Sequence, residues 1–184
     1  MIPSVAGWLS RWAAGWRQRR AIRARVRAQE ERRADALAAA GLSPLERLLF
    51  WWDRDPTPDP PEREIRALEQ RYSVRLPEDF RRYLLAAMPH GNEWDAEGTR
   101  WFPLADIKSL REECADWDTV SALDSDKLLV FADFLIWCYA WAIDCSDTAN
   151  RGRIALITGN DHYVAESFDE FLDRYLRDDG ALHR

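Results

Sequence analysis

The sequence predicts an α+β fold, in which helices precede a series of strands and one helix follows them, with an added N-terminal helical arm. Strand-like segments separated by polar turns fill the stretch from Lys127 to Ala165, and a helix with a marked start follows them directly. Helical periodicity dominates before the strands, in residues 62–87. Helices and strands that are segregated along the chain, rather than alternating, are typical of α+β domains.

The N-terminal segment has the composition of a helix. Alanine and arginine, which both have high helix propensity, dominate residues 5–39. At about 100° per residue, three tryptophans share one face of this helix: Trp8, Trp12 and Trp16. Arginines take over that face further along the chain. A second short helix is expected over Pro44–Trp52, and the proline-rich segment Asp53–Glu62 then marks a boundary.

Two amphipathic helices are expected to open the body of the protein. The first covers residues 62–72 and presents Ile65, Leu68 and Tyr72. The second begins in the motif LPEDF, where Pro77 suits the first helical position and the two acids after it suit the positive end of the helix dipole. Its predicted buried stripe consists of Phe80, Tyr83, Leu84 and Ala87.

Two shorter elements are predicted next. Residues 99–104 have a strand pattern that is ended by Pro103. Residues 105–117 have a helical pattern, with Ile107, Leu110 and Cys114 on the inner side.

Four strands and one helix are expected to complete the body. The strands are Leu128–Asp133, Ile136–Asp144, Arg153–Thr158 and Tyr163–Ala165. Because large and small residues alternate in the second strand, we expect its small face to pack under helices and the aromatic residues 137, 139 and 141 to lie in the core. Ser167 and Glu170 have the spacing of a capping box, and an apolar stripe follows: Phe168, Phe171, Leu172, Tyr175 and Leu176.

The charge of the chain is divided between its two parts. Residues 1–33 hold nine arginines and two glutamates, a net charge of +7, so the remainder carries −13 of the overall −6. The expected organisation is a basic arm (1–41), a short helix with a linker (42–61), an α+β domain (62–178) and a tail (179–184).

The three cysteines are odd in number and form no CxxC pattern. The N-terminus lacks the pattern of a secretory signal, and no apolar run reaches the roughly 18 residues of a membrane-spanning helix. We therefore expect reduced cysteines and a cytoplasmic protein.

Four motifs occur in a set order: LPEDFRRYL, WFPLADI, LLVFAD and YVAESFDEFL. Their order and spacing, over roughly residues 62–177, resemble the SUKH superfamily of Smi/Knr-like domains. The resemblance implies an α+β domain with a mainly antiparallel sheet. Bacterial members are commonly immunity proteins that neutralise a cognate polymorphic toxin, often a nuclease, and eukaryotic members are interaction hubs in cell-wall signalling. This chain departs from many members after the FAD segment, where Phe134, Leu135 and Ile136 replace glycine and polar residues.

The resemblance and the acidic body together predict a non-enzymatic protein-binding domain, an immunity protein of a bacterial toxin–antitoxin pair. A basic toxin domain is the expected partner, because opposite charge speeds encounter. One alternative is a regulatory or adaptor Smi/Knr-like protein of the bacterial cytoplasm, held peripherally at a membrane by its N-terminal helix. Another is an uncharacterised hydrolase.

The candidate catalytic groups are isolated in the sequence. His90, His162 and His183 have no ligand partner at metal-binding spacing, and Cys138 alternates with alanines. Three aspartates near strand ends would have to converge to act as acid or base: Asp133, Asp144 and Asp161. No glycine-rich phosphate loop is present. We therefore predict no catalytic residue, no cofactor and no metal.

Two patches are candidate partner surfaces. The first combines aromatic and acidic residues: Glu93, Trp94, Asp95, Glu97 and Trp101. The alternative for its two tryptophans is that they cover the edge of the core. The second is the apolar hairpin tip formed by Phe134, Leu135 and Ile136. The tryptophans of the arm are expected to dock on the body, on an anionic membrane or on another partner, whereas nucleic acid is disfavoured by the acidic body.

Overall fold

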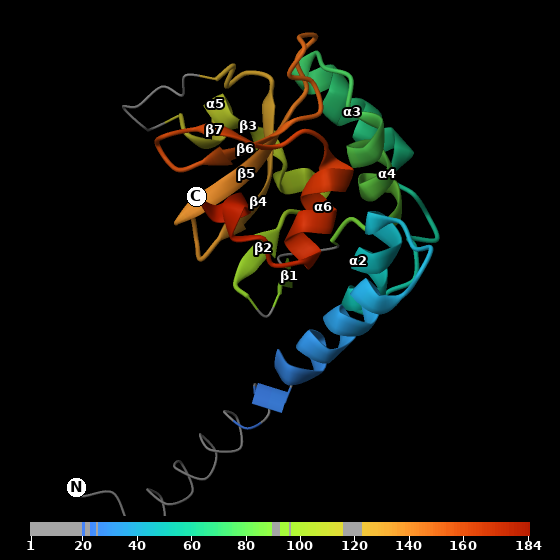
Figure 1. The fold of residues 1–184 in the computed structure, drawn as a ribbon. Coiled ribbons are helices and arrows are strands. Elements are labelled where there is room, and N and C mark those ends of the chain that lie inside the picture. The colour runs from blue at the N-terminus through green and yellow to red at the C-terminus, as the bar shows by residue number, and fades with distance from the viewer. Residues whose placement is uncertain (1–19, 21–22, 25, 90–92, 96, 116–122) are drawn as a thin grey trace, which may run out of the picture.

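The computed structural model describes residues 20, 23–24, 26–89, 93–95, 97–115 and 123–184. Seven strands of this part form one antiparallel sheet in the order β1-β2-β4-β5-β6-β7, with β3 also paired to β4. Their bounds are β1 (Glu93–Trp94), β2 (Thr99–Trp101), β3 (Lys108–Ser109), β4 (Leu128–Phe134), β5 (Tyr139–Asp144), β6 (Ile154–Ile157) and β7 (His162–Ala165). Helices flank the sheet (Figure 1), which confirms the predicted α+β fold.

The described helices lie where their start signals and apolar stripes predict them, with one exception in the middle of the chain. Their bounds are residues 26–38, α2 (Pro44–Trp52), α3 (Glu62–Tyr72), α4 (Glu78–Ala86), α5 (Leu110–Glu113) and α6 (Phe168–Leu176), with 3-10 turns η1 (Leu104–Asp106) and η2 (Gly180–His183). In Figure 1, α6 lies against the sheet, and α2 and α4 lie beside α6. The predicted buried stripe of α4 is confirmed, since all four of its side chains are buried.

Asp79 links the two most characteristic motifs of the chain. Its Oδ2 accepts hydrogen bonds from the backbone N–H groups of Phe168 (2.7 Å) and Asp169 (3.1 Å), in the first turn of α6. Those N–H groups have no partner within their own helix. Asp79, in the first turn of α4, therefore also caps α6. The helix α4 begins at Glu78, so Pro77 is the residue before the helix and not, as the sequence predicts, its first residue.

The predicted start of α6 at Ser167 is confirmed, but the second hydrogen bond of the expected capping box is displaced by one residue. The Ser167 hydroxyl accepts from the N–H of Glu170 (3.1 Å), as a capping residue does. The Glu170 carboxylate, however, accepts from the N–H of Glu166 (2.8 Å), one residue before the cap. The five apolar residues of the predicted stripe are all buried.

The core is an aromatic cluster between α6 and the sheet. Trp141 of β5 is buried, and its ring lies 5.5 Å from that of Phe171 and 6.0 Å from that of Tyr175. The Trp141 indole N–H donates to the carbonyl of Leu182 (3.0 Å), so its one polar atom is satisfied. The small face of β5, expected to pack under helices, is buried at Ala140 and Ala142, but it is the aromatic face that packs under α6. Large side chains are needed there to fill the space beneath α6.

The middle of the chain differs from the prediction in two ways. The helix expected over residues 105–117 is replaced, in its described part, by η1, β3 and α5. Ser109 caps α5 by accepting from the N–H of Glu112, so the helix cannot begin earlier, and β3 is held by pairing with β4. The strand expected over residues 99–104 ends at Trp101, because η1 takes over from Leu104.

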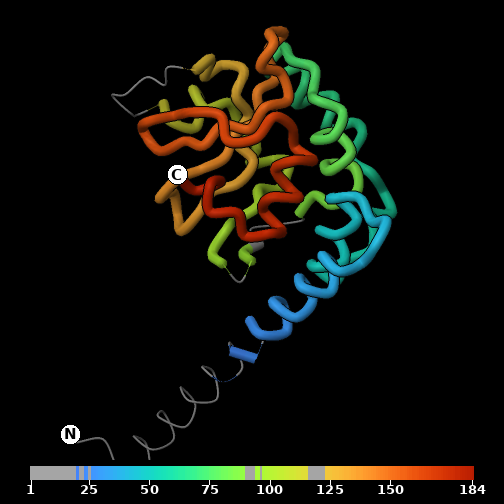
Figure 2. The backbone as a smooth tube through the Cα atoms, in the orientation of Figure 1, coloured from blue at the N-terminus to red at the C-terminus, as the bar shows by residue number. Residues whose placement is uncertain are grey.

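Residues 26–52 pack against α6 and the β1–β2 hairpin; we call this segment the extension. Figure 2 shows its path along the lower end of the body. The ring of Trp51 lies 6.0 Å from that of Tyr175, and the ring of Trp52 lies 5.3 Å from that of Trp101. Arg33 pairs with Glu97 of the body, and Arg32 pairs with Asp53 of the linker (2.8 Å). Trp8, Trp12 and Trp16 lie outside the described residues.

Candidate functional site

Two hairpin turns lie side by side at one end of the sheet. The β1–β2 and β4–β5 hairpins are joined by the pairing of Thr99 with Phe134, and the N–H of Leu135 donates to the carbonyl of Gly98 (3.0 Å). We call this region the hairpin end, and it consists of Trp94, Glu97, Gly98, Leu135 and Ile136. It combines part of both predicted partner patches.

The β4–β5 turn has an unusual backbone. Leu135, Ile136 and Trp137 have φ angles of 44°, 57° and 64°, a left-handed region that side chains with a Cβ disfavour, above all the β-branched isoleucine. Because these residues leave the strand conformation, β5 begins at Tyr139 rather than at the predicted Ile136. The turn instead presents two aliphatic side chains to solvent, with exposed fractions of 52% for Leu135 and 78% for Ile136. Such strained residues are concentrated at functional sites.

Gly98 allows the two turns to approach each other. Its φ is +94°, and a Cβ at this position would lie 2.8 Å from Cδ2 of Leu135. Glycine alone accepts both this backbone conformation and this distance without displacement of Leu135. The position of the Leu135 side chain therefore depends on the first hairpin.

The two tryptophans of the first patch have different environments. Trp94 is 41% exposed, whereas Trp101 is 1% exposed, and its indole N–H donates to Asp95 (3.4 Å). The ring of Trp101 also lies 5.2 Å from that of Tyr175 in an edge-on contact. Trp101 belongs to the core, so its assignment to a partner surface is corrected: a buried side chain cannot reach a partner.

The remaining residues of the two predicted partner surfaces also differ in their exposure and in their contacts. Asp95 is occupied by the fold, since it accepts from the Tyr175 hydroxyl and from the N–H of Thr99 (2.9 Å). Phe134 is half-buried and stacks on Tyr139 at 4.8 Å. Glu97 reaches the surface and pairs with Arg33; burial raises the pKa of the Glu97 carboxyl, and Arg33 opposes that rise. Glu93 pairs with Trp101 in the ladder, and its side chain is outside the described part.

The aspartates that could have converged on a catalytic site are engaged separately. Asp133 is buried against Arg100, and burial raises the pKa of its carboxyl. Asp144, at the other end of the β4–β5 ladder, accepts from the Tyr163 hydroxyl, and Asp161 accepts from backbone N–H groups in its own turn. Within the described ranges, no group of three or more histidine, cysteine and acidic residues is placed to hold a metal ion.

His162 connects the β6–β7 turn to the C-terminal tail. Its Nδ1 lies 2.8 Å from the carbonyl of Asn160, and its Nε2 lies 2.8 Å from the carbonyl of Arg184. A neutral imidazole can donate from only one nitrogen, so both bonds require the imidazolium. These two backbone hydrogen bonds, that to Asn160 first, raise the pKa of His162.

This raised pKa predicts a pH-dependent contribution to stability. A group whose pKa is raised by folding stabilises the fold fully below its unfolded pKa, about 6.5 for histidine, and loses that contribution as the pH rises through its folded pKa. We expect His162→Gln to lower the melting temperature more at about pH 5.5 than at about pH 8.5. Thermal unfolding of both proteins at the two pH values measures this. An equal decrease at both would contradict the assignment of an imidazolium.

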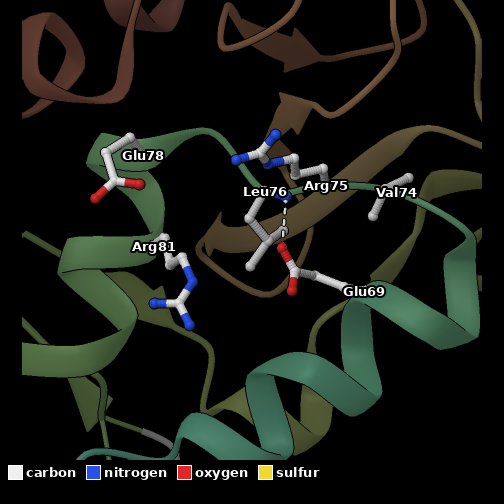
Figure 3. A pocket seen from close by; sticks show the side chains of 6 residues that line it. All are labelled: Glu69, Val74, Arg75, Leu76, Glu78 and Arg81. Carbon is white, nitrogen blue, oxygen red and sulfur yellow. Dashed lines mark hydrogen bonds between the residues drawn. The ribbon is translucent and has the colours of Figure 1, made fainter.

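A polar hollow of about 440 Å³ opens beside the LPEDF motif (Figure 3). It is lined by Glu69, Val74, Arg75, Leu76, Glu78 and Arg81. Its charges largely serve the fold: Glu69 accepts from the N–H of Leu76 (3.0 Å), and Arg81 pairs with Glu62 (2.7 Å). Small-molecule sites are usually more enclosed and mostly apolar, so the hairpin end remains the better candidate for binding.

Comparison with known families identifies the family of this domain. Residues 60–174, more than half of the chain, match the model of the SMI1/KNR4 family (SUKH-1). The chain belongs to this family. SUKH domains are generally non-enzymatic, immunity-type domains and typically interact with other proteins.

Residues 26–52 precede the part that matches the SUKH-1 model, so the extension lies outside the match. No curated protein matches the chain. Of the helices that the structure describes, none is long and apolar enough to cross a membrane.

Proposed function

We propose that this SUKH protein is the immunity partner of a bacterial toxin and that it binds the toxin through the hairpin end. The observation that carries the proposal is that the hairpin end exposes three large apolar side chains, those of Trp94, Leu135 and Ile136. Large apolar side chains at the centre of an interface contribute most of its binding energy. Membership of a family of protein-binding domains supports the same function.

Charge defines the class of toxin. The chain beyond residue 33 carries a net charge of −13, which attracts a basic partner and speeds its association. Nucleases are basic where they hold phosphate groups. A nuclease toxin in the bacterial cytoplasm is therefore the partner that best complements this protein, and an acidic inhibitor can occupy the surface that the nucleic acid needs.

Growth rescue tests the proposal. Co-expression with the toxins encoded beside this protein is expected to restore growth, and Ile136→Asp is expected to abolish the rescue, because a charge replaces an apolar anchor. Aspartate tolerates the left-handed backbone at position 136 better than isoleucine, so the variant should fold. Phe50→Ser, which removes an exposed aromatic side chain from α2, is the matched control and should rescue as the wild type does.

Failure of the wild type to rescue growth against every neighbouring toxin would contradict the immunity function. Full rescue by Ile136→Asp would contradict the hairpin end as the binding surface and leave the function standing.

A further inference from the structure

Arg33 joins the extension to two elements of the family domain. Its Nε donates to the carbonyl of Leu176 (2.6 Å), and its Nη2 donates to the carbonyl of Tyr175 (2.7 Å). Its Nη1 pairs with Glu97 in the β1–β2 turn. The guanidinium carbon also lies 5.4 Å from the ring centre of Trp51, and the side chain is only 13% exposed.

The first contact meets a need of α6. The last carbonyls of a helix have no partner within the helix and carry the negative end of its dipole. Tyr175 and Leu176 are the last two residues of α6, and the planar fork of Arg33 bonds both of their carbonyls. The Tyr175 carbonyl also accepts from the backbone N–H of Asp178 (3.1 Å), so Arg33 adds to an existing bond at that position. Lysine, a point charge on a flexible chain, cannot reproduce this arrangement.

The second contact fixes the hairpin end. β1 has two residues and β2 has three, so their ladder supplies few backbone hydrogen bonds. Side chains must therefore hold the turn: Asp95 does so from within it, and Arg33 does so from outside through Glu97. Glu97 directly precedes Gly98, the residue that contacts Leu135.

We propose that Arg33 is a positioning residue for the hairpin end, which makes helix 26–38 part of the partner-binding unit although it lies outside the SUKH-1 match. The consequence for partner binding rests on the proposed function; the effect on the hairpin does not. If Glu97 moves, Gly98 moves with it, and the hydrogen bond and close contact between Gly98 and Leu135 change. The family domain thus supplies the apolar anchors, and the extension sets their position.

Amide hydrogen exchange of the full chain tests this proposal. Loss of a buried charged hydrogen-bond partner is expected to speed exchange in residues 97–101 and at Leu135 by about tenfold or more in Arg33→Gln. Arg33→Lys should restore part of the protection. Arg32→Gln, which removes the pair with the largely exposed Asp53, is the matched control and should exchange as the wild type does.

A second variant separates positioning from general loss of stability. Glu97→Gln should speed exchange of the same hairpin amides, and the double variant should add little to either single change, since both remove one interaction. The amides of β5 and β6 should keep their protection in every variant. Unchanged hairpin exchange in Arg33→Gln would overturn the proposal, and so would an equal acceleration in β5 and β6.

Partner binding gives the second readout. Arg33→Gln is expected to weaken growth rescue, and Arg32→Gln is expected to leave it intact; equal rescue by both would overturn the link to binding. Because exchange is measured on the protein alone, a wild type that rescues no growth contradicts the toxin proposal and not the role of Arg33 in the hairpin.

Discussion

Trp101→Ala is expected to destabilise the protein by about 3–5 kcal/mol, the range for truncation of a large buried aromatic side chain. Trp101 is buried, and its ring contacts include those of Trp52 in α2, Tyr83 in α4 and Tyr175 in α6. Its removal leaves a cavity between the extension, α4 and α6 that rigid neighbours cannot fill. Urea denaturation followed by circular dichroism measures the loss of free energy of unfolding.

Trp94→Ala is the matched control on the same hairpin. Its side chain is 41% exposed, and surface substitutions usually change stability by less than about 0.5 kcal/mol. This variant should therefore unfold at about the same urea concentration as the wild type. Under the proposed function, it should also lose affinity for the toxin. A stable Trp101→Ala protein would contradict its place in the core.

The sequence could not distinguish these two tryptophans, because both lie in short strands on either side of one acidic turn. The register separates them: Trp94 pairs with Arg100, and Trp101, the next residue, must point to the other face of the sheet. That register depends on a turn in which Asp95 and Gly98 take part. A single slipped residue would have exchanged the two faces.

Elements with their own start signals were predicted most closely. α2 follows Ser43, α3 follows the proline-rich boundary and α6 follows Ser167, and each has an uninterrupted apolar stripe. Residues 105–117 have a helical pattern as well, but two of them, Lys108 and Ser109, form a strand that pairs with β4. This pairing is a tertiary interaction, and it overrides the local preference for a helix.

The candidate site was predictable in composition and not in geometry. The run Phe134–Ile136 stands out as apolar, yet the division into an inward Phe134 and an outward Leu135 and Ile136 depends on three left-handed residues. Gly98 has a weak signal, since glycine is common in turns. No local sequence pattern marks Arg33, because its partners lie 64 and more than 140 residues away in the sequence.

Removal of residues 1–59, which leaves about the part that matches the SUKH-1 family, is expected to have the second large effect. The cut removes Leu48, Leu49 and Trp51, which are buried in the common core. Burial of each such side chain contributes about 1.5–3 kcal/mol, so the loss is comparable with the whole stability of a domain, about 5–15 kcal/mol. We expect the shortened chain to be largely unfolded or aggregated, as circular dichroism and size-exclusion chromatography would detect.

A chain that begins at Leu42 separates the two parts of the extension. It keeps α2 but loses helix 26–38, with the buried Ala36 and the cap that Arg33 gives to α6. It should therefore fold with a stability between those of the full protein and the chain that begins at Pro60. If the chain from Pro60 melts at the temperature of the full protein, the extension is a passive appendage. If the chain from Leu42 melts between the other two, helix 26–38 and α2 each contribute to the stability of the core, as the burial of Ala36 and of Trp51 predicts.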